Sequence, residues 1–195
     1  MTHPIAIAPI TTPELAPPDL VMVAARTGYS HVGLRMLPSV PDGFSWPLMN
    51  DAALLRETLA RMHDTGVAVL DIDIIRLNPT SRPDSFSRFF ATGQALGAKS
   101  VLVAADDPDL SRLAANFVAL CDLAAPFGLT IDIEFMPWTT IPDLTAAIRL
   151  MRTVGRANAG ILVDALHVDR SNSRLDDLAS LPRNWLHYMQ ICDAP

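Results

Sequence analysis

The sequence predicts an α/β protein, a (β/α) barrel with seven strands that is incomplete at its C-terminus. The main indication of this fold is a regular repeat of glycines. Glycines recur about every 30 residues, the length of one βα unit, each after a helical pattern and shortly before an apolar run. They are Gly28, Gly66, Gly97, Gly128 and Gly155. Glycine is the usual residue just past a helix end, because it adopts the left-handed conformation without strain. Strict alternation of strands and helices predicts a parallel sheet with right-handed crossovers.

The same glycines, together with prolines and aspartates near helix starts, indicate where the strands and helices begin and end. We expect strands at residues 5–10, 31–35, 67–75, 100–104, 130–134, 161–164 and 186–191. We expect helices at roughly 14–27, 51–65, 84–96, 109–126, 142–154 and 174–181. Four helices have an aspartate at or near their start, where a carboxylate accepts from free N–H groups and favours the helix dipole. These residues are Asp51, Asp84, Asp109 and Asp143.

Two architectures fit this alternation, a barrel and an open doubly wound sheet, and the polar residues favour the barrel. No Gly-rich phosphate fingerprint follows the first strand. Asp71 and Asp73 alternate with isoleucines, as do Asp132 and Glu134, which predicts one strand face towards a lumen and one towards helices. Polar residues also gather at the C-terminal ends of the strands, where a barrel places its active site. They are Thr11, Thr12, Arg35, Arg76, Asp106, Glu134, Asp164 and Gln190.

The predicted barrel is one unit short. A closed barrel of this type has eight strands, and the pattern yields seven before Pro195. We therefore expect residues 1–195 to form a single barrel-like domain whose eighth βα unit is missing. The first and last strands would then have uncovered edges, which predicts association with a second copy of the chain or, as the alternative, a longer polypeptide that supplies the missing strand.

Composition narrows the class of protein. A chain of 195 residues with 50% apolar residues suits one globular domain. The net charge is −6 and Lys99 is the only lysine, so there is no basic patch for nucleic acid. No apolar run approaches the ~18–20 residues of a membrane helix. The N-terminus lacks a basic signal-peptide region, and two cysteines are too few for a disulfide framework, so we expect a cytoplasmic protein.

Three apolar stretches end in oxygen-bearing side chains. Residues 129–137 run into Glu134, and residues 160–170 run into Asp164, with His167 three residues later. The last stretch, residues 186–195, runs into Gln190 and Asp193. Two carboxylates and an amide oxygen are a hard ligand set suited to Mn²⁺ or Mg²⁺, with Co²⁺ as a further candidate. Helix caps or rim ion pairs are the alternative for the two carboxylates, and a satisfied core amide is the alternative for the glutamine.

The runs IEFMPW, VDALHVDRS and MQICDAP resemble the xylose isomerase-like superfamily of sugar phosphate isomerases and epimerases. This superfamily also holds inosose dehydratase-like and dehydroshikimate dehydratase-like enzymes. The resemblance implies one divalent metal at the C-terminal mouth of a TIM barrel, bound by Glu134, Asp164 and Gln190. The family's fourth ligand would lie in the missing eighth unit.

The resemblance also implies roles for the neighbouring residues. The family's matching histidine lies beside the metal and binds substrate oxygen or moves a proton, which predicts the same for His167. A loop imidazole bonded to the backbone is the alternative. Arg35 and Arg170 are candidates for binding a substrate phosphate or carboxylate, and plain salt bridges are the alternative. Asp193 is a candidate for a substrate hydroxyl or a turn residue, and His187 has no partner pattern and is assigned a structural role.

We therefore expect a divalent-metal-dependent isomerase or epimerase of sugars, sugar phosphates or related polyols. Glu134 would be both ligand and base in a reaction through an enediolate. The first alternative is a metal-dependent dehydratase on the same site, with His167 as the acid. The second is a truncated barrel without catalysis. The negative charge argues against a DNA-repair endonuclease of the same superfamily.

Overall fold

The computed structural model describes residues 3–171 and 173–193. Ala194 and Pro195, which end the third predicted ligand stretch, lie outside the described residues. The chain divides into two compact units. Unit 1 consists of residues 1–74 and 88–101, and unit 2 consists of residues 75–87 and 102–195.

The strands of the described residues run in the order β1-β2-β3-β4-β5-β6-β7. The pairs β1–β2, β2–β3, β5–β6 and β6–β7 are parallel. A doubly wound sheet reverses its strand order at a switch point, whereas a (β/α) barrel follows the chain, so the order agrees with the predicted barrel type. The strands are β1 (Ala6–Ile7), β2 (His31–Arg35), β3 (Ala68–Leu77), β4 (Ser100–Ala105), β5 (Thr130–Glu134), β6 (Ala159–Asp164) and β7 (Met189–Gln190).

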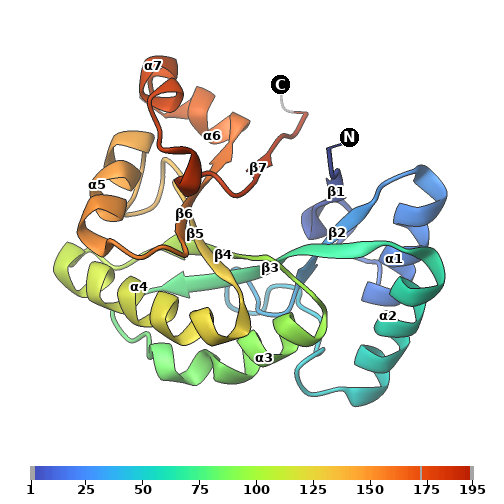
Figure 1. Ribbon diagram of the computed structural model, residues 1–195. Helices are drawn as coiled ribbons and strands as arrows, with labels where there is room; N and C mark the ends of the chain where they lie inside the picture. Colours follow the sequence, from blue (N-terminus) through green and yellow to red (C-terminus); the bar gives the residue numbers. More distant parts are fainter. Residues whose placement is uncertain (1–2, 172, 194–195) are drawn as a thin grey trace. The chain divides into compact units, whose positions relative to one another are not determined.

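Helices connect these strands (Figure 1). The α-helices are α1 (Pro17–Thr27), α2 (Ala52–Thr65), α3 (Ser87–Ala95), α4 (Leu110–Ala124), α5 (Leu144–Val154), α6 (Ala165–Arg170) and α7 (Leu175–Ala179). Short 3-10 turns are η1 (Pro9–Thr11), η2 (Pro83–Phe86), η3 (Ala125–Phe127) and η4 (Arg183–Trp185). Within unit 1, α1 packs against α2 and β2.

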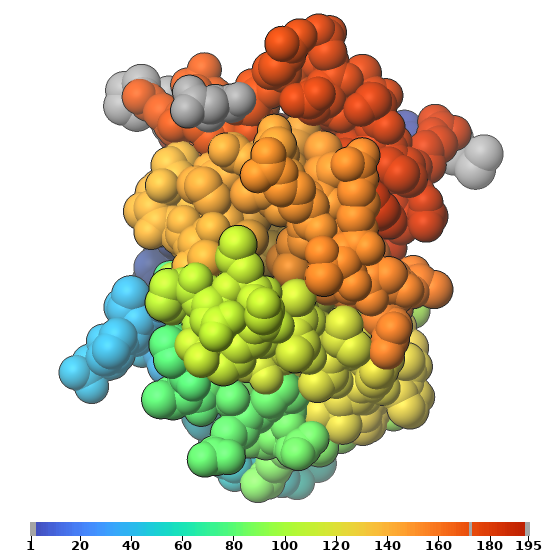
Figure 2. All heavy atoms as spheres, turned by 90° about the vertical axis from the view of Figure 1, so that its left-hand side faces the viewer, coloured from blue at the N-terminus to red at the C-terminus, as the bar shows by residue number. Residues whose placement is uncertain are grey.

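Within unit 2, α4 and α5 pack against each other and against β5 and β6 respectively. Their outer surfaces lie side by side in Figure 2, α4 in yellow and α5 in orange. Both helices bury an apolar stripe that includes Phe117 and Leu120 on α4 and Leu144 and Met151 on α5. This stripe covers one face of the β5–β6 pair and leaves the other face for polar groups.

The register of β5 and β6 divides their side chains between the two faces. Asp132 pairs with Gly160, and Glu134 pairs with Leu162. Because side chains alternate along a strand, Asp132 and Glu134 lie on one face and the isoleucines between them lie on the other. Both acidic residues are buried. The alternation predicted from the sequence is therefore present in the structure.

The helix ends agree with the glycine and aspartate pattern in all but one place. The five predicted glycines have φ between 58° and 84°, the left-handed region that glycine tolerates. Asp51, Asp109 and Asp143 are N-caps whose side chains accept backbone N–H groups. Asp84 is instead the second residue of η2, because Pro83 starts a 3-10 turn before α3 begins.

Three elements differ most from the prediction, while other boundaries shift by up to three residues. β1 ends at Ile7 instead of residue 10, because Pro9 has no N–H for the ladder and starts η1. β7 has two residues instead of six, since only Met189 and Gln190 pair with β6. The six-residue helix α6 was not predicted, because the run after Asp164 is too short for a clear helical period.

One segment of the described residues, Leu110–Phe127, is long and apolar enough to cross a membrane by length and composition alone, with a mean hydropathy of 1.3. From the sequence we expect no apolar run of the length of a membrane helix, and this segment differs from that expectation. Its Phe117 and Cys121 are buried in unit 2, while Asp122 pairs with Arg156 at 2.6 Å. Burial raises the pKa of the Cys121 thiol to about 12. Such a two-sided pattern is typical of a core helix.

Replacing the N-cap Asp51 with alanine is predicted to lower the free energy of unfolding by about 1 kcal/mol. The Asp51 carboxylate accepts hydrogen bonds from the backbone N–H groups of Ala53 and Leu54 at 2.9 Å, and alanine leaves both donors to water. Urea denaturation followed by circular dichroism measures the difference. Asp51→Ser keeps an acceptor and should lose little; equal losses in both variants would contradict a capping role.

Candidate metal centre

Glu134 and Asp164 end neighbouring parallel strands of unit 2. Glu134 is the last residue of β5 and Asp164 is the last residue of β6, where its backbone lies two residues beyond the partner of Glu134. The two carboxylates therefore lie on the same face of the sheet at its C-terminal edge. Glu134 is 6% exposed and Asp164 is 8% exposed, so neither is an ordinary surface acid.

Asp164 also starts α6. Its Oδ1 accepts a hydrogen bond from the Leu166 N–H at 2.7 Å, which is an N-cap contact. Capping was one alternative to metal ligation for this residue, and the structure shows that the cap is present. A carboxylate has a second oxygen, so the cap leaves Oδ2 available and fixes the direction in which it points.

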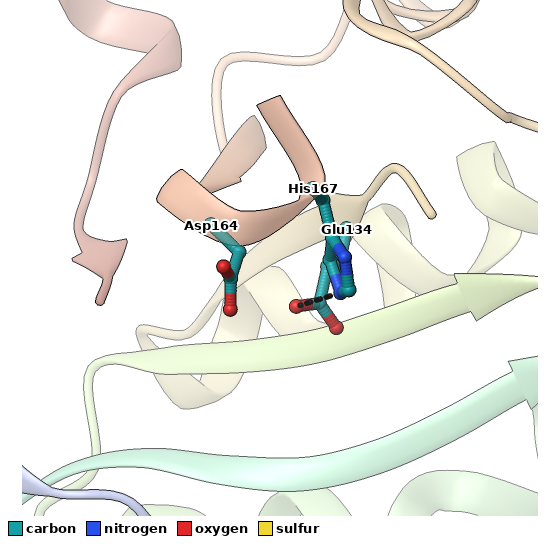
Figure 3. Close-up of side chains that lie close together, drawn as sticks. All are labelled: Glu134, Asp164 and His167. Carbon is teal, nitrogen blue, oxygen red and sulfur yellow. Dashed lines mark ion pairs between the residues drawn. The ribbon is translucent and has the colours of Figure 1, made fainter. Parts of the chain in front are cut away.

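The first turn of α6 brings His167 to the two carboxylates. Its Nε2 lies 3.6 Å from Glu134 Oε1, with side-chain exposures of 9% and 8%. One ligand atom from each of Glu134, Asp164 and His167 lies within 4.8 Å of the others (Figure 3). His167 was predicted to lie beside the metal, with a loop imidazole bonded to the backbone as the alternative, and the structure places it on helix α6 within the cluster.

His167 is held in a desolvated position. Burial lowers its pKa, and the negative charge of Asp164 opposes this to a lesser extent. Among the described residues, its buried Nδ1 has no hydrogen-bond partner. The ring of Trp138 meets the imidazole edge to face with 5.1 Å between centroids, although Trp138 itself is 68% exposed.

This cluster fits a divalent cation. Ligand atoms that share one ion with bonds of about 2.0–2.2 Å lie at most ~4.4 Å apart, so small side-chain movements bring all three groups within range. Two buried carboxylates at this separation repel each other unless a proton or a cation compensates them. Two carboxylates and one imidazole suit Mn²⁺, Co²⁺ or Zn²⁺ better than Mg²⁺, which prefers oxygen ligands alone.

Gln190 lies next to this cluster in the sheet. It is the register partner of Asp164 across the β6–β7 pair, so the two side chains share a face at the same level. It is partly exposed. Its role as a ligand stays a prediction.

Two of the three predicted substrate-binding residues, Arg35 and Arg170, have partners within the protein. Arg35 belongs to unit 1, where it donates to Asp73 at 2.6 Å and lies 4.8 Å from the Phe44 ring centroid. Burial raises the pKa of Asp73, and the Arg35 hydrogen bond opposes this. Arg170 is exposed at the end of α6, 3.7 Å from Asp169. Asp193 is exposed after β7. Binding of substrate by these three residues stays a prediction.

The structure adds a buried pair that the sequence did not indicate. His187 Nδ1 lies 2.6 Å from Asp132 Oδ1, although the sequence pattern offers no partner for this histidine. Gly160, the register partner of Asp132, lies against both side chains. A glycine inside a strand often marks a close approach of another group, and Gly160 is the signal that could have indicated the pair.

Comparison with known proteins gives a family and a fold. The model of the family described as xylose isomerase-like TIM barrel matches residues 21–195. Inosose isomerase from Bacillus licheniformis is 36% identical over 61 residues, which are 30% of this chain and 22% of that protein. The matched segment therefore spans less than a quarter of this curated relative.

Two solved structures show the same fold. One is the IOLI protein with a binding zinc atom, with a TM-score of 0.79 and 19% identity over 97% of this chain and 72% of that chain. The other is the probable 3-DHS dehydratase AsbF from Bacillus anthracis, with a TM-score of 0.78 and 16% identity over 96% and 72% of the two chains. The predicted TIM-type α/β fold is confirmed.

The buried pair predicts a pH dependence of stability that Asp132→Asn removes. The hydrogen bond with Asp132 raises the pKa of His187, and burial opposes this. A pKa that is raised by folding stabilises the protein fully below the unfolded value of about 6.5, and this contribution is lost as the pH rises through the folded value. The wild-type free energy of unfolding should therefore fall over that window.

Urea denaturation at a series of pH values, in the presence of a chelator, measures this dependence. Asp132→Asn should flatten the profile in that window. His63→Asn, which removes an exposed imidazole, is the matched control and should keep the wild-type profile. An unchanged profile in Asp132→Asn would rule out the pair as its source.

Proposed function

Because the chain belongs to the xylose isomerase-like TIM barrel family, we propose that it provides the divalent-metal site of an isomerase or epimerase. The substrate would be a sugar, a sugar phosphate or a related polyol. The curated relative that bears the name inosose isomerase supports this class, over the 61 residues that match. The matched segment covers 22% of that protein, so both activity and substrate are proposals for this chain.

One observation carries the proposal: Glu134, Asp164 and His167 converge at the C-terminal edge of β5 and β6. This is the edge at which TIM-barrel enzymes place their active sites. Burial of a carboxylate is costly, and two buried carboxylates next to a buried imidazole are explained by a cation that compensates their charge. Among the described residues the buried Nδ1 of His167 has no hydrogen-bond partner, which is an unsatisfied polar atom of the kind that functional sites contain.

Glu134 and Asp164 would hold the cation, together with Gln190 or His167. A divalent ion held there would polarise a substrate carbonyl and stabilise negative charge on its oxygen. The zinc atom in the similar IOLI structure supports metal use, and Mn²⁺, Co²⁺ and Zn²⁺ are the ions that the donor set suits.

The protein groups would move the protons. Glu134 removes the proton from the carbon next to the substrate carbonyl, which produces an enediolate. His167 lies 3.6 Å from Glu134 Oε1 and transfers a proton between the two oxygens of that enediolate. Asp164, whose Oδ1 is engaged by the α6 cap, keeps its orientation throughout the reaction. Return of the proton to the neighbouring carbon gives the isomer, and return to the same carbon from its opposite face gives the epimer.

A dehydratase is the second candidate, because the same proton loss can be followed by expulsion of a β-hydroxyl with His167 as the acid. The similarity in fold to the probable 3-DHS dehydratase favours its inclusion. Both candidates act on small molecules in the cytoplasm, without nucleic acid or membrane as partner, and we propose self-association for both. Arg35, Arg170 and Asp193 are proposed to bind the anionic or hydroxyl groups of the substrate.

Conservative changes of the two carboxylates are predicted to abolish Mn²⁺ binding in calorimetry. Asp164→Asn keeps the oxygen that caps α6 but loses the negative charge, and Glu134→Gln changes charge alone. Each should weaken binding by 100-fold or more, roughly the loss of one charged ligand. Asp169→Asn, an exposed acid on the same helix, should bind like the wild type. Undiminished binding in both ligand variants would exclude this site.

The reaction class is tested by solvent exchange. With Mn²⁺ and a panel of ketoses, ketose phosphates and inososes in D₂O, we expect deuterium to enter the substrate at carbon, detected by NMR. His167→Asn should slow this exchange by about 100-fold while Mn²⁺ still binds through the carboxylates. Loss of water with an enone absorbance would assign a dehydratase. No exchange with any of these compounds would leave a barrel without this catalysis.

A further inference from the structure

We propose that Asp132 and His187 position Gln190 at the metal centre, by fastening the segment before β7 to β5. This inference rests on the proposed function, taken with Gln190 as the ligand that joins Glu134 and Asp164. Asp132 and His187 are 55 residues apart in the chain, and their contact joins two segments of unit 2.

The strand that carries Gln190 has little of its own to hold it in place. β7 pairs through two residues, Met189 with Val163 and Gln190 with Asp164. Met189 is 63% exposed and Ile191 is 78% exposed, so apolar burial contributes little on either side of the glutamine. A two-residue ladder at the end of a sheet frays readily. Another contact must therefore fix this segment if Gln190 is to ligate a metal.

The contact between His187 and Asp132 meets this need. It lies three residues before Gln190, and the side chain of Asp132 is 1% exposed. The second carboxylate oxygen of Asp132 accepts a hydrogen bond from Thr130 Oγ1 at 2.7 Å, so its own strand orients it. A buried, oriented carboxylate of this kind strongly favours its partner, because loss of the partner leaves a buried charge uncompensated.

Gly160 leaves the space that this contact occupies. A β-carbon at position 160 would overlap Asp132 Oδ1 and His187 Nδ1. Unlike the five glycines at the helix ends, Gly160 has no positive φ, so its backbone conformation does not require glycine. Space for the pair is the physical reason for a glycine at this point of β6.

The pair lies on the same face of the sheet as the metal centre. Asp132 is two residues before Glu134 on β5, and Gly160 is four residues before Asp164 on β6. Because the period of a strand is two residues, all four positions share one face. The pair therefore forms a layer directly beneath the ligands, and its loss would free Gln190 without touching Glu134 or Asp164.

The experiment compares His187→Ala with His187→Asn in the whole chain. Alanine removes the donor, whereas the asparagine amide can still donate to Asp132. His187→Ala should raise hydrogen–deuterium exchange in the peptide that contains residues 186–191 and leave β5 and β6 unchanged. It should also weaken Mn²⁺ binding in calorimetry about tenfold, as losses of groups that orient ligands do. His187→Asn should restore most of both, which keeps the test valid if the alanine variant folds poorly.

A double-mutant cycle with Gln190→Ala separates positioning from general destabilisation. If His187 acts through Gln190, His187→Ala should add no loss of Mn²⁺ affinity in the Gln190→Ala background. An equal tenfold loss in both backgrounds, or unchanged exchange in His187→Ala, would overturn the inference. If Gln190→Ala binds Mn²⁺ like the wild type while His187→Ala still raises exchange, the fastening stands and Gln190 is removed from the proposed ligand set.

Discussion

The register of the β5–β6 ladder is the constraint on which the polar centre of unit 2 depends. Side chains alternate along a strand, so a shift of one residue would exchange Asp132 and Glu134 with the isoleucines before them. The apolar stripe of α4 and α5 prevents that shift, because charged groups on the helix-covered face would be desolvated without partners. Packing on one face thereby holds Asp132 and Glu134 on the other.

The C-terminal end of β6 combines structural and chemical roles in one residue. Asp164 ends a strand, caps a helix and contributes to the acidic cluster. Helix α6 follows β6 directly, without a loop between them, so His167 lies on the first turn of α6 and not on a flexible loop. Rigid secondary structure on both sides of the cluster favours a defined geometry for its ligand atoms.

Much of this arrangement could be predicted from the sequence, because its signals are local. Glycines past helix ends, aspartate caps and apolar runs can each be recognised from a few consecutive residues, and together they locate most helices and strands. Glu134 and Asp164 could be identified because each follows an apolar run directly. The partner of His187 could not, since it depends on the register of strands that are distant in sequence. The helix α6 was not predicted because six residues are too few to show a helical period. The shortness of β7 was not predicted because the length of a strand depends on which residues pair with the neighbouring strand, and not on composition alone.

Gly160 also limits how this sequence can change. Because a β-carbon at this position would overlap both Asp132 Oδ1 and His187 Nδ1, a larger residue requires that both side chains move or be replaced by smaller ones. The three positions can therefore be exchanged only in a restricted order. Even alanine, the smallest possible replacement for Gly160, is therefore not expected as the first substitution among these three positions. Once the side chains at positions 132 and 187 have both changed, position 160 can accept a residue with a β-carbon.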